Sequence, residues 1–549
     1  MKKPSELISK LRNLYLDEID KRKLRNLLII LSISILLFSL SLYLKNLASL
    51  WFWEEQSEHG PGYFYWTKYN DSEILEVWYL EAYGDASYYY EPYLLAFKYE
   101  NWNPYAGGNY EDDPLNGYAY GPLFIFGLYF VSLFVGLFNP GMERSMIVYQ
   151  SVKWTHLVFD SLCVVMIYII IISLNSFKKE DVKKHTLGLL GGLIFILMPI
   201  NLLYVDSVFL NTPQMCFFTL LSYFFFMKNK YKTSAFFLSI AWLSKQMPLF
   251  LLIPWFLIIW KKDSLKEALL DFVVPFIITT FILSLAWIFI SPVSYAWRVF
   301  GPGKPLNFVD LDHPRHTVTL AHSFLFLGSE GLANFYAIIN SYMIPFLVFY
   351  ALACFISYFN GKILGENESY FTILTTWIII NTHLFISRGV YKYYNAFITP
   401  FIILSVLVFL DDNILKLKLS VPRVRKNTNE DNEMKNQENR KTIIIHQNKT
   451  VVLALLIISF LITNGLFYYY NWVLISNSRF LHPLYLLILF VIISLFIPPV
   501  VYGSFTKKSN YAMIKDDVVY ILKQIKSGYV TLKQRIIKKP KIKKQNLHS

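Results

Sequence analysis

The stretch NLLIILSISILLFSLSLYL, residues 26–44, carries no charged side chain. An α-helix rises 1.5 Å per residue, so this run nearly matches the ~30 Å hydrocarbon core of a bilayer. It follows a 25-residue head with eight Lys/Arg against four Asp/Glu. Because basic flanks stay in the cytoplasm and no small-residue cleavage site follows the run, we expect a cytoplasmic segment at 1–25 and an uncleaved anchor.

Similar apolar runs recur along the chain, in which 55% of the 549 residues are apolar and 18% aromatic. This composition predicts an all-α integral membrane protein with about ten transmembrane helices plus a re-entrant hairpin. The net charge of +14 gathers beside the apolar runs, a pattern typical of membrane orientation and not of nucleic-acid binding. The three cysteines show no paired or metal-ligand spacing. Further spans are expected near 153–174, 187–206, 213–227, 268–290, 334–358, 370–387, 395–410, 450–470 and 482–502.

Charge also assigns the loops to the two sides of the membrane. Residues 51–120 hold thirteen Asp/Glu against two lysines, which predicts a long extracytoplasmic first loop. A membrane core over 26–410 would also contain a second large outer loop at 292–333. The predicted cytoplasmic segments are basic: 178–185, 228–232, 261–266, a flexible linker at 411–449 and, after a helix pair at 450–502, a tail at 503–549 that is expected to lie on anionic lipid.

Two segments interrupt the simple alternation of spans. Residues 121–138 are expected either to dip or lie on the surface, or to pair with part of 142–150 and cross twice. Residues 233–260 have basic flanks on both sides and Lys245-Gln246 at their middle. Each half reaches only about 21 Å, which favours a hairpin with Lys245 at its tip, although one long tilted span is the alternative. An ionisable residue at that depth is a functional candidate.

Other cations are expected on the outer side, where orientation does not require them. Arg298, Arg315 and His316 lie in the stretch 296–322, and Arg388 and Lys392 begin a later outer loop. A hydrated loop and interfacial anchoring are the ordinary explanations. Cations at headgroup depth nevertheless suit a phosphate carried on a lipid.

The first outer loop offers the complementary chemistry. Glu81, Asp85 and Glu91 stand among tyrosines that include Tyr88. Aromatic rings with scattered carboxylates suit sugars, because ring C–H faces pack on aromatics and hydroxyls bond to carboxylates. A carboxylate could deprotonate an acceptor hydroxyl while Lys and Arg stabilise a departing phosphate.

The arrangement resembles the GT-C superfamily of polytopic glycosyltransferases that use polyprenyl-phosphate sugars. It is most similar to the dolichyl-phosphate-glucose transferases of N-glycan assembly and to the first GPI mannosyltransferase. The landmarks cover residues 80–410, and their order is more specific than any one of them. In chain order they are YGDASYYYEPYLLAF, YGPLFIF, VKWTHLVFDSLCVV, MPINLLYVDSVFLNTPQ, SKQMPLFLLIP and VYKYYNAFITP.

This resemblance implies a catalytic base at Asp85, with helix capping as the structural alternative, and a donor-phosphate role for Lys245 and Gln246. Chemistry adds Arg298, Arg315 and, more weakly, His316 as phosphate ligands. The remaining candidates, for the sugar or acceptor, are Glu81, Tyr88, Glu91, Asp206, Gln214, Arg388 and Lys392.

Two departures from the family pattern and one acidic cluster qualify this reading. Gly121 replaces the first proline of the Tyr-Pro-Pro-Leu segment, and the stretch at 204–214 lacks the relatives' glutamine motifs. The acids at 111–113 are expected to be solvated, because a lipid-phosphate donor needs no metal clamp. We therefore expect no metal and no cofactor besides the sugar donor, while the donor sugar stays open.

The sequence thus predicts an inverting hexosyltransferase whose partners are the lipid donor, a glycan or glycolipid acceptor and the bilayer. A transporter or flippase of lipid-linked sugars is the main alternative, but no internal repeat of spans is evident. A non-catalytic sugar-binding subunit would keep the aromatic residues without needing Lys245.

Overall fold

The structure is a computed structural model that divides into two compact units, residues 1–497 and 498–549. All residues described below lie in the first unit. They are residues 21–56, 90–99, 103–105, 120–174, 181–198, 201–202, 212–300, 319–386, 395–408, 418–420, 442–444 and 475–494.

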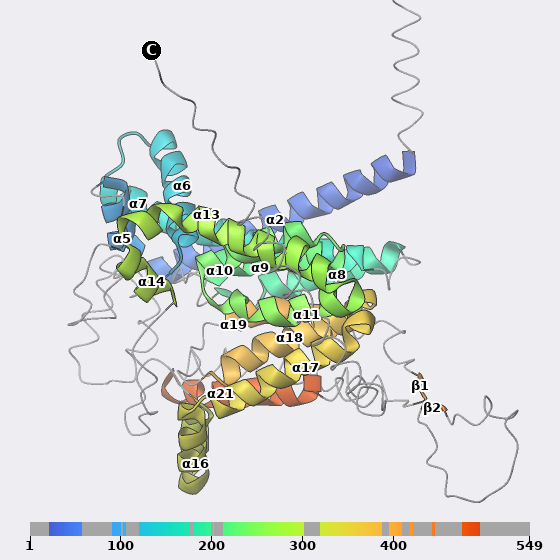
Figure 1. Ribbon diagram of the computed structural model, residues 1–549. Coiled ribbons are helices and arrows are strands. Elements are labelled where there is room, and N and C mark those ends of the chain that lie inside the picture. Colours follow the sequence, from blue (N-terminus) through green and yellow to red (C-terminus); the bar gives the residue numbers. More distant parts are fainter. Residues whose placement is uncertain are drawn as a thin grey trace, which may run out of the picture. The chain divides into compact units, whose positions relative to one another are not determined.

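The described part of the chain is helical (Figure 1). Four segments are long and apolar enough to cross a membrane: Asn26–Ser49, Met146–Ser173, Leu265–Ile290 and Ile344–Glu366. They belong to α2 (Lys21–Gln56), α7 (Arg144–Ser173), the run from α12 (Leu265–Glu267) through η5 (Ala268–Val273) to α13 (Val274–Ile290), and α17 (Ile344–Glu366). The other helices are α5 (Glu91–Tyr99), α6 (Pro122–Phe138), α8 (Asp181–Ile196), α9 (Thr212–Met227), α10 (Tyr231–Ser244), η4 (Met247–Leu251), α11 (Leu252–Lys262), α14 (Pro292–Phe300), α15 (Leu320–Phe326), α16 (Glu330–Ser341), α18 (Glu368–Leu384), α19 (Asn395–Val408) and α21 (Ile475–Ser494).

Two short strands lie in the segment that the sequence predicts to be a flexible linker. β1 (Lys418–Ser420) and β2 (Thr442–Ile444) pair antiparallel, with Leu419 opposite Ile443. The ladder is three residues long on each side, so it adds a local hairpin to the linker and leaves the helical class unchanged.

Small residues let neighbouring helices approach closely. On α17, Gly361 and Gly365 face α11, and a Cβ added at Gly361 would lie 2.7 Å from Lys261 Cβ. The spacing of these glycines is the G-x-x-x-G pattern that brings helix backbones together in membranes. On α8, Gly188 faces the Tyr168 ring in the same way. Close backbone packing of this kind stabilises a bundle whose outer surface is apolar.

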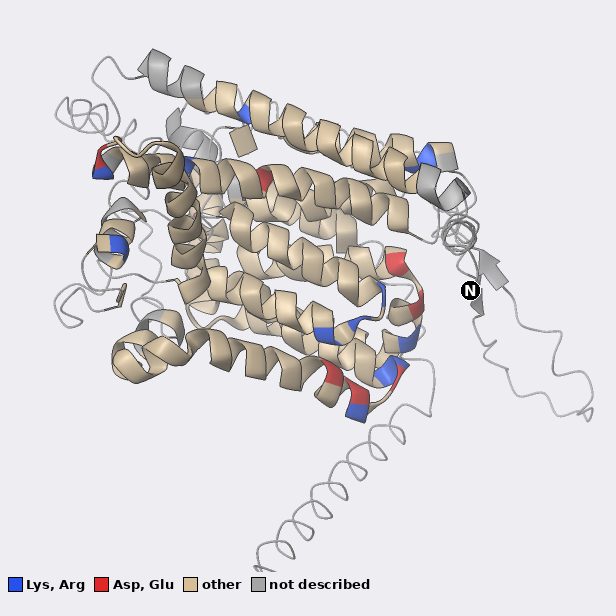
Figure 2. Ribbon diagram, turned by 90° about the horizontal axis from the view of Figure 1, so that it is seen from above, with Lys and Arg blue, Asp and Glu red and all other residues tan. Residues whose placement is uncertain are grey.

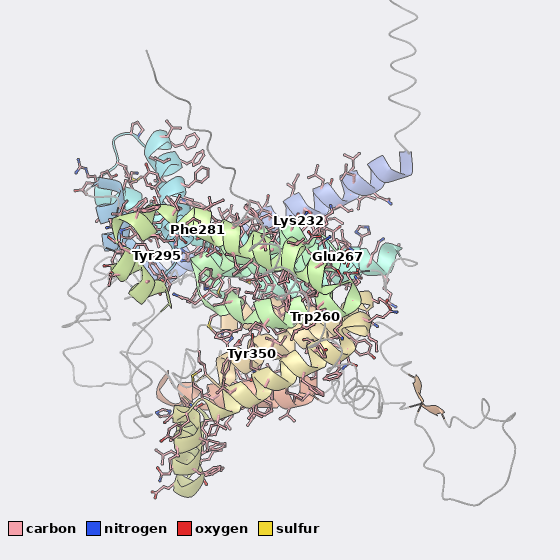
Figure 3. All side chains as sticks on the ribbon, in the orientation of Figure 1. Lys232, Trp260, Glu267, Phe281, Tyr295 and Tyr350 are labelled. Atoms are coloured by element: carbon pink, nitrogen blue, oxygen red, sulfur yellow. The ribbon has the colours of Figure 1, made fainter. Side chains whose placement is uncertain are left out.

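Most of the charged residues in the described helices are concentrated at one end of them (Figure 2). This charged end is formed by the turns at 228–232, 261–271 and 366–368, and Figure 3 shows Lys232 and Glu267 there and Tyr295 at the opposite end. Three polar contacts join these turns: Lys228 Nζ to Glu368 Oε1 at 3.5 Å, Tyr231 Oη to Asp263 Oδ2 at 2.7 Å and Lys232 Nζ to Asp271 Oδ1 at 3.3 Å. Two of the segments predicted to be cytoplasmic therefore lie together.

The predicted hairpin at 233–260 forms. Helix α10 ends at Ser244, Lys245 is extended (φ −161°, ψ 143°), and the chain returns through η4 and α11. The two ends meet again at the charged end, where the Tyr231 hydroxyl donates to Asp263. The alternative of one tilted helix is therefore wrong. The helix breaks for a local reason, since the extended Lys245 and Pro248 interrupt the helical hydrogen bonds.

The span predicted near 334–358 begins later in the chain, because the candidate membrane span here is Ile344–Glu366. The chain forms two helices here, and Figure 1 shows α16 turned steeply away from α17. Met343 between them adopts the left-handed conformation (φ 56°), and Pro345 stands in the first turn of α17. Because both helices are apolar, hydropathy does not reveal the turn that separates them.

The segment 121–138 forms a single helix, α6, which packs against the first turns of α7, and whether it dips into the membrane or crosses it stays a prediction. Residues 144–150 already belong to the first turns of α7. A short turn at 139–143 connects the two helices, and the Asn139 amide hydrogen caps α6 by bonding to the Val135 carbonyl at 3.1 Å.

Candidate cationic site

The buried Lys245 is the centre of the candidate site. Its side chain is only 3% exposed, and its Nζ lies 5.7 Å from the centroid of the Tyr120 ring. The backbone N–H of Lys245 still bonds to the Ala241 carbonyl, so the residue is held by the last turn of α10. Gln246 follows as the N-cap of η4. The helix break thus holds a lysine inside the bundle and beside an aromatic face, which favours a cation there.

The start of α6 is fixed against the end of α10. A Cβ added to Gly121 would lie 2.1 Å from the Leu243 carbonyl oxygen, which is too close for any residue other than glycine. The departure of Gly121 from the Tyr-Pro-Pro-Leu pattern therefore has a packing reason. The neighbouring Tyr120 is positioned from the other side, because its carbonyl accepts a hydrogen bond of 2.9 Å from the Tyr105 hydroxyl.

A group of aromatic rings lines the site beside Lys245. The ring of Tyr90, the residue before α5, stacks on His156 with centroids 5.8 Å apart and planes at 20°. The edge of Tyr90 also meets Tyr120 at 6.3 Å and Phe124 at 4.9 Å. The residue before α5, helix α6 and helix α7 each contribute a ring, so the chain just before α5 lies inside the bundle at this point.

Two buried imidazoles belong to elements beside this site: His156 of α7 stacks on Tyr90, and His383 lies on α18, which packs against η4 directly after the helix break. Nδ1 of His156 lies 2.6 Å from the Val152 carbonyl, and Nδ1 of His383 lies 2.8 Å from the Ile379 carbonyl. A carbonyl oxygen only accepts, so Nδ1 of each ring carries a proton and Nε2 is left to face other groups. The site therefore combines an ammonium with two orientated imidazoles from α7 and α18.

Sequence reasoning did not select Tyr120, His156 or His383 as site residues. A signal existed for two of them, because Tyr120 and His156 lie within the quoted landmarks YGPLFIF and VKWTHLVFDSLCVV. His383 lies on an apolar helix in which no local motif distinguishes it. Only the packing of α18 near the break after α10 brings it to Lys245.

Gln214, a predicted sugar contact, links two helices. Its Nε2 donates a 2.7 Å hydrogen bond to the Leu123 carbonyl, and its side-chain amide lies against Gly127 of α6. The side chain is 5% exposed. This contact holds α9 to the same helix start that touches Lys245, and a sugar-binding role for Gln214 stays a prediction.

The other predicted site residues are described less fully. Glu91 is the first residue of α5 and Arg298 lies in α14, and for both the backbone alone is described. The rest lie outside the described residues: Glu81, Asp85, Tyr88, Asp206, Arg315, His316, Arg388 and Lys392.

A second buried polar cluster joins α2 to α7. Lys45 and Asp160 form an ion pair with both side chains at most 2% exposed, and Asn201 Nδ2 donates to Asp160 Oδ1 at 3.2 Å. One residue along, Ser161 donates to Ser41 at 3.0 Å. Asp160 belongs to a quoted landmark, but its partner Lys45 directly follows the first apolar run, where it resembles an ordinary flanking lysine.

The site therefore defines the chain as a helical protein with candidate membrane spans and a buried cationic centre lined by aromatic rings. Within the described residues, no group of three or more His, Cys, Asp or Glu is placed to hold a metal ion. Comparisons with known protein families, with curated proteins and with solved structures found no match.

Proposed function

We propose that this chain is a membrane glycosyltransferase. It transfers a hexose, mannose or glucose, from a polyprenyl-phosphate sugar to a lipid-linked glycan or glycolipid acceptor on the extracytoplasmic side. The termini of the chain are cytoplasmic in this proposal, and the transfer inverts the anomeric carbon.

The observation that carries the proposal is the environment of Lys245. The Lys245 side chain is 3% exposed, lies beside the Tyr120 ring and sits at a break between helices, and an ionisable residue at such depth is a functional candidate. A phosphate on a lipid carrier is an anion that a lysine can bind there, and the nearby rings suit the attached sugar. The site lies away from the charged end, because Tyr105, which bonds the Tyr120 carbonyl, packs edge-to-face on Tyr295 at 5.1 Å.

The reaction needs one base and a stabilised leaving group. Asp85, assigned by the resemblance, takes the proton of an acceptor hydroxyl as its oxygen attacks the anomeric carbon. The bond from that carbon to the phosphate oxygen breaks on the opposite side, and polyprenyl phosphate leaves with the electron pair. Lys245 stabilises the departing anion, so no separate acid is required.

The test measures sugar transfer from radiolabelled polyprenyl-phosphate mannose and polyprenyl-phosphate glucose by the purified chain in lipid, with a glycolipid extract as acceptor. We expect one donor to be used, Asp85→Asn to abolish transfer while donor binding persists, and Lys245→Met to weaken donor binding at least tenfold. Lys262→Gln is the matched control, because this lysine is at the charged end and bonds to Asn229.

The outcomes separate the candidate functions. Transfer by the wild type that is lost in Asp85→Asn supports the enzyme proposal. The donor that the wild type uses identifies the sugar. Undiminished transfer by Asp85→Asn would exclude that residue as the base. If neither donor is used but labelled lipid crosses sealed vesicles, the chain is a flippase and the enzyme proposal is wrong.

A further inference from the structure

Helix α16 is too short to cross a bilayer and is turned away from the helices around it. Its twelve residues span about 18 Å, against a hydrocarbon core of ~30 Å. Figure 1 shows it leaving the near end of α17 at a steep angle. The turn is built into the backbone, because Met343 is left-handed (φ 56°) and Pro345 starts the next helix.

The two faces of α16 differ, because one contacts the protein and the other exposes large apolar side chains. One face packs on the protein through three buried residues, Ala333, Tyr336 and Asn340. The exposed side is mostly apolar, with Asn334 as a polar residue at its edge, and its large side chains are 46–64% exposed: Leu332, Phe335, Ile338 and Tyr342. The spacing of three to four residues places these side chains on one continuous stripe.

The apolar stripe continues onto a candidate membrane span. Across the turn, Ile344, Leu347 and Val348 of α17 are also about half exposed. The stripe carries no Lys or Arg, and the one acid of the helix, Glu330, stands at its start. An exposed apolar surface therefore runs from the candidate span onto α16.

We propose that α16 is an interfacial helix that lies in the plane of the membrane, with Leu332, Phe335, Ile338 and Tyr342 inserted among the acyl chains of the leaflet opposite the charged end. Because the stripe is uncharged, burial of apolar area drives insertion and anionic lipid is not required. The occupant is the lipid hydrocarbon itself. This inference is independent of the proposed function.

Anchoring of this kind has a consequence for the second outer loop. Tyr336 of α16 meets Phe324 of α15 edge-to-face at 5.9 Å, and α15 begins at Thr319 with a capping box closed by His322. The segment that carries Arg315 leads directly into that cap. A helix held at headgroup depth therefore fixes one end of the segment at the same depth.

The test measures membrane depth by spin labelling of the full chain with its three native cysteines replaced. Labels are placed singly at Phe335→Cys and Leu332→Cys on the stripe, at Glu330→Cys at the helix start, and at Phe281→Cys, which is 52% exposed on the span α13. Collision rates with oxygen, which enriches in lipid, and with a water-soluble nickel chelate are compared in vesicles of zwitterionic phosphatidylcholine.

We expect oxygen collisions to exceed nickel collisions at both stripe positions, with a depth between those of Glu330→Cys and Phe281→Cys. Two stripe positions are used so that the test still decides if one variant fails to fold. Nickel collisions that exceed oxygen collisions at both would place the stripe in water and overturn the proposal. Spin–spin broadening that grows with the protein-to-lipid ratio would identify a second copy as the occupant and would also overturn it.

Discussion

Gly121 is the residue at which the candidate site depends most directly on the absence of a side chain. A methyl group there would lie 2.1 Å from the Leu243 carbonyl, and backbone on both sides leaves nothing to rotate away. We expect Gly121→Ala to destabilise the protein by about 1–3 kcal/mol, the range typical of overpacking. It should also lower donor affinity, because α6 would shift away from Lys245. Thermal unfolding in detergent and donor binding measure the two effects.

Gly331 provides the control for that substitution. It lies in α16 with no atom within 4 Å of an added Cβ, so Gly331→Ala should leave unfolding unchanged or raise its temperature slightly. If Gly121→Ala and Gly331→Ala both unfold like the wild type, the contact between the start of α6 and the end of α10 is not needed for the stability of the site.

The Lys45–Asp160 pair makes a separate prediction at the residue scale. Both groups are buried, so removing one leaves an uncompensated charge. Lys45→Met or Asp160→Leu alone should cost about 3–5 kcal/mol, while the double variant should recover most of that loss. A double-mutant cycle of unfolding free energies measures the coupling. Additive single effects would show that the pair does not hold α2 to α7.

At the scale of elements, the hairpin formed by α10 and α11 is closed by Tyr231. Burial raises the pKa of this tyrosine, and the hydrogen bond to Asp263 raises it further. A raised pKa favours the protonated form in the folded state, so this stabilisation is present below the ordinary tyrosine pKa of about 10 and is lost as the pH rises above it.

Tyr231→Phe should therefore cost about 0.5–1.5 kcal/mol at pH 8, the usual value of one hydrogen bond. The difference from the wild type should shrink when the pH is raised above about 10, because only the wild type then loses the stabilisation. Unfolding temperatures of both proteins across this pH range test the sign. A difference that widens with pH would contradict the assignment.

Sequence and structure agree on an element where polar or charged residues interrupt an apolar run. The hairpin at 233–260 could be predicted because Lys245-Gln246 interrupts an apolar run with basic flanks. The turn at Met343 could not, since apolar residues continue through it and backbone conformation alone marks the break. The site follows the same rule: Lys245 stands out in the sequence, whereas His383 comes near it only because α18 packs against η4.

At the scale of the whole molecule, charged turns lie at one end of the helices, and the aromatic approach to Lys245 lies toward the opposite end. The turns at 228–232 and 261–271 meet through hydrogen bonds and ion pairs, while the opposite end carries Tyr295, Tyr105 and the aromatic approach to Lys245 (Figure 3). Positive flanks at the first end predict that it is cytoplasmic. A lipid-linked substrate would then be met on the other side.

This orientation can be tested with two exposed positions at opposite ends. Lys266→Cys lies in α12 at the charged end, and Ser329→Cys lies in the turn between α15 and α16. In sealed vesicles whose cytoplasmic face is inside, a membrane-impermeant maleimide should label Ser329→Cys at once and Lys266→Cys only after the membrane is opened with detergent. The reverse pattern would show that the basic turns face outward. Labelling of both positions without detergent would mean that the helices between them do not cross the membrane, and the outer location of the Lys245 site would fall with it.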